Sequence, residues 1–183
     1  VIHDVAMVDY VQRLARDTAI VRLWPMGALT RDLAGSEMTE IGLMSEAGAV
    51  AFTNGRRAIT NAQTMRRALT YARDFDALIV HHAEDPALAG EGVMHEGETA
   101  TRLGLKGIPA EAETVMLSRD LKLVGLAGGR YHAAQLSTAR CLTPLRPATE
   151  RGLPVTSGVS PDNRPLDATA IAPYRPLLIP RPP

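Results

Sequence analysis

Short apolar segments alternate along this chain with longer segments of helical periodicity, and this alternation constrains the fold more than any other feature. Apolar or β-branched runs predict five strands, at residues 20–24, 49–52, 77–82, 131–137 and 153–157. Apolar spacing predicts helices between them, including 6–16, one that begins at Asn61, and one from Pro109 to a stop at Gly128. Repeated strand, helix, strand units indicate parallel pairing with right-handed crossovers.

Two architectures satisfy this order of elements. Five parallel strands form either an open doubly wound sheet or five-eighths of a (β/α)₈ barrel, which typically needs about 250 residues. The chain has 183 residues, and the order of elements alone does not decide between the two. Residues 24–30 (WPMGALT), after the first predicted strand, match neither the G-x-G-x-x-G nor the Walker phosphate-binding pattern. A nucleotide-binding function is therefore poorly supported.

Capping and proline signals complete the expected organisation. Ser36 is the predicted N-cap of a helix that ends at Gly48. Ten of the 13 prolines lie at or beyond Pro144. Because an interior proline removes a helical hydrogen bond, Pro144 and Pro147 are expected to interrupt the helix after the fourth predicted strand. We therefore expect a partial barrel domain over residues 1–160 and a proline-rich irregular segment over residues 161–183.

Composition excludes several classes of function. Lys and Arg number 20 against 20 Asp and Glu, which gives no broad attraction to nucleic acid or an anionic membrane. The longest apolar runs are far shorter than the roughly 20 residues of a membrane helix. A single cysteine, Cys141, rules out an internal disulfide, and we expect a cytoplasmic location. The start has no secretory-signal pattern and no initiator Met, so we expect a processed chain or a piece of a longer one.

Adjacent histidines end the third predicted strand. His81 and His82 precede Glu84 and Asp85 directly. At a barrel strand end, a histidine can ligate zinc through a neutral ring nitrogen, because strand ends are rigid and point into the active-site mouth. The alternative is a structural histidine at a capped strand end, followed by a solvated acidic turn. No pair of histidines has the H-x-H or H-E-x-x-H spacing of a self-contained metal site.

The other candidate residues give weaker signals. His95 is expected in a loop that enters a helix. His132 and Gln135 lie three positions apart on one predicted strand, so they should point to opposite faces and only one can face a barrel interior. Cys141 has no nearby base and is expected to be a buried residue, not a nucleophile. Ser137-Thr138, after the fourth predicted strand, is expected to cap a helix.

Several segments together resemble the dihydroorotases of the amidohydrolase superfamily, in particular the bacterial single-function enzymes. They occur in the family's order and cover roughly residues 4–163. The segments are RLWPMGALT (22–30), EAGAVAFTNG (46–55), IVHHAEDP (79–86), MHEGETA (94–100), LGLKGIPAEAE (103–113), GRYHAAQLST (129–138) and GLPVT (152–156). The resemblance implies a (β/α)₈ barrel, of which this chain supplies about the third to the seventh strand.

The resemblance also implies a reaction and a zinc cofactor. Family members interconvert dihydroorotate and N-carbamoyl-aspartate in pyrimidine biosynthesis, through a zinc-bound hydroxide. Their ligands are an H-x-H pair on the first strand, an acidic group on the fourth, one histidine on each of the fifth and sixth, and an aspartate on the eighth. Here His82 matches the fifth-strand ligand. Asn54 and Gln135 stand at degenerate ligand positions of the fourth and sixth strands, because neutral amides are poorer zinc ligands.

Three hypotheses follow. The first is a dihydroorotase-like cyclic amide hydrolase whose remaining ligands lie in sequence outside this chain. The second is a catalytically inactive homologue that acts as a structural partner of aspartate carbamoyltransferase, which the changes at Asn54 and Gln135 favour. The third is a solitary α/β domain that binds a small molecule. The resemblance further implies a small-molecule substrate and a homodimer.

Overall fold

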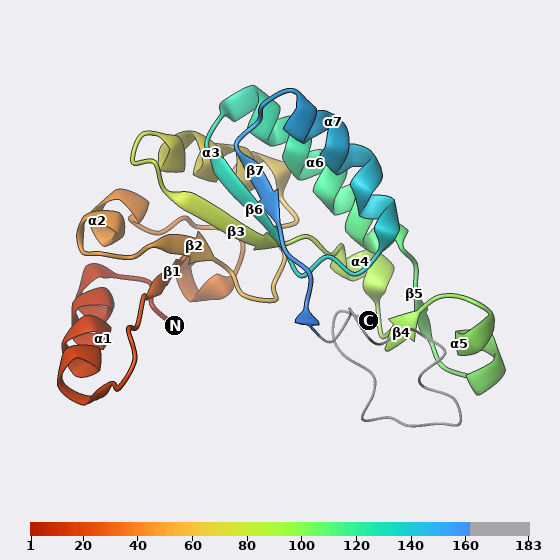
Figure 1. The fold of residues 1–183 in the computed structure, drawn as a ribbon, viewed down its shortest axis with the longest axis horizontal. Helices are drawn as coiled ribbons and strands as arrows, with labels where there is room; N and C mark the ends of the chain where they lie inside the picture. Colours follow the sequence, from red (N-terminus) through yellow and green to blue (C-terminus); the bar gives the residue numbers. More distant parts are fainter. Residues whose placement is uncertain (162–183) are drawn as a thin grey trace.

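A parallel sheet of five strands organises the computed structural model, which describes residues 1–161 (Figure 1). Each strand pairs in parallel with the next of the five along the chain, in the order β1-β2-β3-β6-β7. The strands are β1 (Met26–Ala28), β2 (Ala51–Thr53), β3 (Leu78–His82), β6 (Arg130–Ala134) and β7 (Val155–Ser157).

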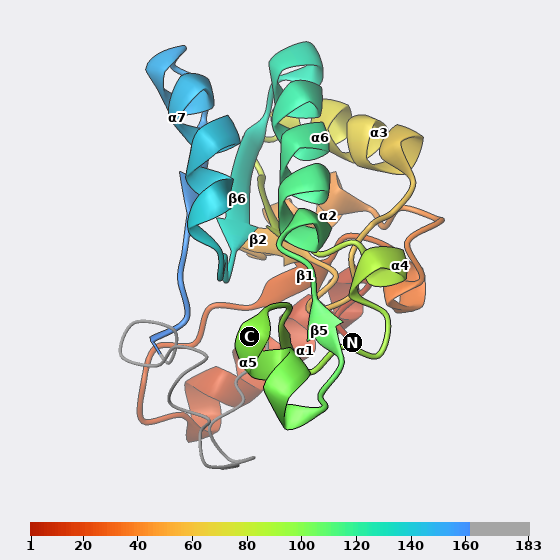
Figure 2. The same cartoon turned by 90° about the vertical axis from the view of Figure 1, so that its right-hand side faces the viewer.

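This strand order decides between the two predicted architectures. A doubly wound sheet reverses its strand order at a switch point and carries helices on both faces. Here the order does not reverse, and the helices α3 (Ala62–Arg73), α6 (Glu111–Ala127) and α7 (Leu142–Glu150) lie side by side along one side of the sheet (Figures 1 and 2). The described residues therefore form an arc of a (β/α) barrel, as the resemblance implies.

Local capping explains where the main helices begin. Helix α1 (Val5–Thr18) starts after Asp4, whose carboxylate accepts a hydrogen bond from Met7 N at 2.8 Å. The side chain of Asn61 accepts in the same way from the backbone at the start of α3. Helix α6 ends at Ala127, and Gly128 and Gly129 follow with positive φ, as predicted.

Strand alternation divides the side chains of the sheet between two faces. Phe52, Ile79 and Tyr131 are fully buried in the main core, which also contains apolar residues of α3 and α6. Close packing on this side requires Gly27, because a Cβ there would lie 2.7 Å from the Phe52 ring. On the opposite face, Arg130 and Thr156 are exposed and His132 is half-buried. That second face corresponds to the inside of a barrel.

An excursion separates β3 from α6. It consists of α4 (Pro86–Ala89), β4 (Met94–His95), α5 (Glu98–Leu103) and β5 (Gly107–Ile108), and β4 and β5 form a separate parallel pair. The excursion begins four residues after His82, at the carboxyl end of the main sheet. His95 therefore lies on a short strand and not in the loop that its sequence context predicted.

Two predicted boundaries near the amino end are wrong. Residues 20–24 form no strand, and β1 begins only at Met26. Ile20 is fully exposed and Trp24 is 67% exposed, so their side chains lack the burial that stabilises a strand. Ser36 caps no helix, because residues 30–39 fold back as a loop in which Thr39 Oγ1 donates to Ala28 O at 2.6 Å. Helix α2 (Ile41–Glu46) starts after that loop.

The expected interruption after the fourth predicted strand is also wrong. The short 3₁₀ turn η2 (Ala139–Cys141) leads directly into α7, which contains both Pro144 and Pro147. Pro144 lies in the first turn, where the backbone N–H has no helical acceptor. Pro147 removes one interior hydrogen bond, but burial of Leu145 and Ala148 against the core keeps the helix formed. The predicted irregular segment, residues 161–183, lies outside the described residues except for residue 161.

Candidate metal site and active-site face

The three predicted ligand positions gather at one edge of the sheet. Asn54 follows β2, His82 is the last residue of β3, and Gln135 follows β6. These strands are parallel neighbours, with Thr53 opposite Val80 and His82 opposite Ala134. Active sites of (β/α) barrels are built at this carboxyl edge. The structure therefore brings the predicted positions to the expected place, although their side chains have different surroundings.

His82 has the properties of a ligand. The residue is 5% exposed, and its Nδ1 is buried with no hydrogen-bond partner among the described residues. Its Nε2 lies 3.9 Å from Glu84 Oε1, which is too long for a hydrogen bond. A buried polar atom without a partner is rare and points to an atom or ion that completes the site. Imidazole nitrogen is a normal zinc ligand, so His82 fits a metal site.

Asn54 does not fit a metal site. It is 1% exposed, and both polar atoms of its side chain are engaged by Thr30. Oδ1 accepts from Thr30 N at 3.0 Å, and Nδ2 donates to Thr30 Oγ1 at 2.7 Å. Thr30 Oγ1 also accepts from Gly35 N at 2.9 Å. Asn54 therefore ties the loop after β1 to the end of β2, and its oxygen is not available for a cation.

Gln135 lies outside the strand that was predicted to carry it. Strand β6 ends at Ala134, and Gln135 adopts a left-handed backbone conformation with φ of 55°. Hydrogen bonds on both sides fix this turn, since Gly158 N donates to Ala133 O and Leu136 N donates to Gly158 O. The side chain is exposed and carries a neutral amide. Strand alternation therefore does not relate Gln135 to His132, and Gln135 supplies no anionic or imidazole ligand.

A complete metal site is not found within residues 1–161. That part of the chain holds no group of three or more His, Cys, Asp or Glu side chains arranged to hold a metal ion. Of the three ligand positions, His82 alone fits zinc. Asn54 and Gln135 do not fit, because Asn54 is engaged by Thr30 and Gln135 is an exposed neutral amide.

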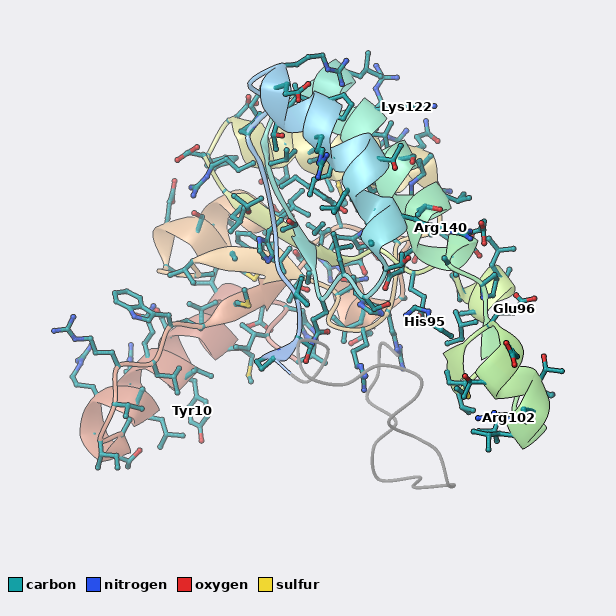
Figure 3. The ribbon with its side chains drawn as sticks, turned by 45° about the vertical axis from the view of Figure 1, so that its right-hand side comes forward. Tyr10, His95, Glu96, Arg102, Lys122 and Arg140 are labelled. Carbon is teal, nitrogen blue, oxygen red and sulfur yellow. The ribbon has the colours of Figure 1, made fainter. Side chains whose placement is uncertain are left out.

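His95 and His132 have other surroundings. Figure 3 shows His95 on the excursion beside Glu96, below Arg140 in η2, the 3₁₀ turn that precedes α7. It lines an open pocket with Ser137 and with Arg140, which pairs with Glu111. His132 Nδ1 lies 2.7 Å from Thr156 Oγ1, and partial burial lowers the pKa of His132. Neither histidine joins His82 in a shared site.

The family assignment rests on a match over most of the chain. A family model described as "Dihydro-orotase-like" matches residues 4–140. The chain belongs to this dihydroorotase-like family. A dihydroorotase of Anaeromyxobacter sp. strain K is 47% identical over 156 residues, covering 85% of this chain and 36% of the relative. A dihydroorotase of Solibacter usitatus is 43% identical over 174 residues, covering 94% of this chain and 40% of the relative.

Solved structures give the same fold. A D-hydantoinase of Bacillus sp. AR9 aligns with a TM-score of 0.69 at 20% identity, over 91% of this chain and 38% of that one. An L-hydantoinase (dihydropyrimidinase) of Arthrobacter aurescens aligns with a TM-score of 0.68 at 20% identity, over 93% and 40% of the two chains. The dihydroorotase-like chain thus has the fold of part of these two hydantoinases, and it spans 36–40% of the length of the two dihydroorotase relatives.

Sequence reasoning missed a buried polar cluster behind His82. His81 Nδ1 lies 2.7 Å from Asp120 Oδ2, which also accepts from Tyr131 OH at 2.7 Å. Asp120 Oδ1 accepts from Arg119 Nε at 2.9 Å. His81 is 1% exposed and Asp120 and Tyr131 are fully buried. His81 is therefore a structural histidine, which was the alternative to a zinc ligand. Because neighbouring strand residues point to opposite faces, strand alternation could have distinguished His81 from His82.

The cluster predicts a pH dependence of stability. Burial alone raises the pKa of the Asp120 carboxyl, but hydrogen bonds from His81 and Tyr131 and the charge of Arg119 outweigh burial, so the pKa is lowered. A lowered pKa contributes stability above the unfolded value of about 3.9 and loses it as the pH falls through the folded value. We expect the free energy of unfolding, measured with denaturant, to fall below about pH 4. Asp120→Asn should flatten this slope, and an unchanged slope would contradict the assignment.

Cys141 is buried, as predicted. Its Sγ donates to Glu113 Oε2 at 3.4 Å, and Glu113 also accepts from Ser137 N, Ser137 Oγ and Thr138 N. Burial and the Glu113 charge raise the pKa of the Cys141 thiol to about 12. Of the predicted cap Ser137-Thr138, Thr138 caps the 3₁₀ turn η2 by accepting from Arg140 N, while Ser137 Oγ donates to Glu113 Oε1.

This environment predicts an unreactive thiol. At pH 8, about one thiol in ten thousand is ionised at a pKa near 12, and only the thiolate is nucleophilic. We expect folded protein to resist iodoacetamide at pH 8 for hours, as measured by mass spectrometry. The same protein in guanidinium chloride is the control and should be fully alkylated. Rapid alkylation of Cys141 in the folded state would contradict this environment.

Proposed function

We propose that the protein containing this chain is a dihydroorotase-like cyclic amide hydrolase, which interconverts dihydroorotate and N-carbamoyl-aspartate. Membership of the dihydroorotase-like family supports this activity. The observation that carries it is His82, which is buried at the carboxyl end of β3 with an unpartnered Nδ1. A histidine held in this way at the active-site edge of a barrel is suited to bind a metal ion.

We propose His82 as a zinc ligand of that enzyme. When bound, zinc would polarise the amide carbonyl and lower the pKa of a water molecule, so that hydroxide forms near neutral pH. The role of this chain would be to supply one ligand, His82, and to hold it rigidly at the end of β3. Further ligands would come from parts of the protein outside the described residues, because Asn54 is engaged by Thr30 and Gln135 is a neutral amide.

A second candidate function is favoured by these same two residues. Asn54 and Gln135 both lack the coordinating power that the family has at their positions. The protein would then be an inactive dihydroorotase homologue that supports aspartate carbamoyltransferase in a complex. On either reading, we propose a homodimer and a cytoplasmic location. For the part of the chain that the structure describes, no helix is long and apolar enough to cross a membrane.

One pair of measurements separates the two candidates. Zinc content of the full-length protein is measured by plasma mass spectrometry, beside a dihydroorotate hydrolysis assay with added zinc. One or two zinc ions per chain with turnover would support the hydrolase. A folded protein with neither zinc nor turnover would overturn the hydrolase and favour the structural partner. Copurification of a carbamoyltransferase from the native source would then be the next measurement.

A further inference from the structure

The cluster behind β3 holds His81 at both ring nitrogens. His81 Nδ1 lies 2.7 Å from Asp120 Oδ2, and His81 Nε2 lies 2.8 Å from the backbone N of Ile59, whose N–H points at it. A backbone N–H can only donate, so Nε2 accepts and carries no proton. The ring proton is therefore on Nδ1, where it is donated to the Asp120 carboxylate. The hydrogen bonds thus select one tautomer of a neutral imidazole.

These contacts tie the end of β3 to three other parts of the fold. Ile59 belongs to the loop that connects β2 to α3, and Asp120 belongs to α6. Asp120 also receives the Tyr131 hydroxyl from the neighbouring strand β6. Arg119 extends the cluster, because it contacts Asp120 Oδ1 and donates to Thr60 O at 2.8 Å. The end of β3 is therefore held by the loop that follows β2, by the neighbouring strand β6 and by helix α6.

His82 depends on this anchorage for its position. Successive strand residues point to opposite faces, so His81 faces the helices while His82 faces the barrel interior. The His82 ring has no hydrogen bond of its own at Nδ1 among the described residues, and Glu84 is 3.9 Å from Nε2. The orientation of His82 is therefore set by backbone and packing. A rotation of the backbone at His81 would displace the His81 and His82 rings at the same time, and the two rings would move in opposite directions.

We propose that His81 is a positioning residue for His82. Its two hydrogen bonds lock the end of β3 so that the His82 ring is presented to the active-site edge without reorganisation. This inference rests on the proposed role of His82 as a metal ligand. His81, Asp120 and Tyr131 are buried on the helix side of the sheet, away from the barrel interior, so His81 would act only through His82.

Three variants of the full-length protein separate the effects of the two His81 hydrogen bonds. His81→Asn places an amide near the Nδ1 position, which keeps a donor for Asp120 and loses the acceptor for Ile59. His81→Gln reaches the Nε2 position, which keeps the acceptor and loses the donor. His81→Leu loses both. The matched control is His95→Asn, on the separate β4-β5 pair.

Two properties are measured for each variant. Zinc affinity is measured by competition with a chromophoric chelator, and amide hydrogen exchange is measured on metal-free protein. Removing residues that orient a metal ligand typically weakens affinity 10–100-fold. We expect at least a tenfold loss in His81→Leu, smaller losses in His81→Asn and His81→Gln, and none in His95→Asn. Exchange at residues 81–83 should accelerate at least tenfold in His81→Leu, while exchange in α7 stays unchanged.

Other outcomes would overturn the proposal. Unchanged zinc affinity and unchanged exchange at residues 81–83 would show that His81 does not position His82. Equal acceleration of exchange throughout the protein, in all three His81 variants, would indicate a merely structural residue. If His82→Ala leaves zinc affinity unchanged, the proposed role of His82 itself fails. That result differs from failure of the His81 proposal, in which His82→Ala weakens zinc binding but the His81 variants do not.

Discussion

Replacing His82 with alanine is expected to abolish zinc binding by the full-length protein. His82 is buried at the carboxyl end of β3, and its Nδ1 has no partner within the described residues. Alanine removes the ligand atom itself. Because loss of residues that merely orient a ligand costs 10–100-fold in affinity, loss of the ligand should cost on the order of a hundredfold or more. Zinc per chain, measured by plasma mass spectrometry after dialysis, should fall close to zero.

The matched control for this prediction is His95→Ala. His95 also lies on a strand, but it is half-buried, belongs to the excursion (Figure 3) and lines the pocket that contains Ser137 and Arg140. Zinc content should stay at the wild-type level in this variant. If His82→Ala retains the same zinc content as wild type and His95→Ala, His82 is not a ligand, and the metal-dependent hydrolase would need a site without it.

Replacing Asp120 with alanine is expected to destabilise the fold by about 3–5 kcal/mol, as found when one partner of a buried ion pair is removed. The Asp120 carboxylate is fully buried and accepts hydrogen bonds from His81, Tyr131 and Arg119. Alanine would leave two of these donors, on His81 and Tyr131, buried without an acceptor. Each buried unsatisfied group costs about 1–3 kcal/mol. The measurement is the midpoint and slope of urea unfolding, followed by circular dichroism.

Asp74→Ala provides the control for Asp120. Asp74 also pairs with an arginine, Arg73, at 3.3 Å, but both side chains are more than half exposed. Exposed ion pairs contribute about 0–1 kcal/mol, so this variant should unfold close to wild type. Similar destabilisation by Asp120→Ala and Asp74→Ala would mean that the buried cluster does not anchor α6 to the sheet.

Much of the fold was predictable because its signals are local. The alternation of apolar runs and helical segments predicted four of the five main strands, and Asn61 caps the helix that was predicted to begin there. The errors came where burial decides the outcome. Residues 20–24 have strand-forming side chains but are exposed, and α7 forms despite Pro147 because its apolar side packs on the core.

The candidate site was predictable in place but not in detail. Resemblance to dihydroorotases located His82, Asn54 and Gln135 at successive strand ends, and the sheet brings these positions to one edge. It did not reveal that Asn54 is committed to Thr30, 24 residues away, or that Gln135 leaves the strand in a left-handed conformation. Nor did Asp120 stand out, although it is the buried partner of His81, 39 residues earlier.

The sequence by itself determined the order of strands and helices, the ends of several helices, and the family to which the chain belongs, because periodicity, capping and motif order are properties of short segments. Tertiary structure alone decided that His81 faces Asp120 while His82 remains unpartnered at Nδ1 among the described residues, and that Asn54 closes a loop. These features depend on contacts between residues far apart in the chain. Local periodicity does not encode which distant side chain completes a buried hydrogen bond.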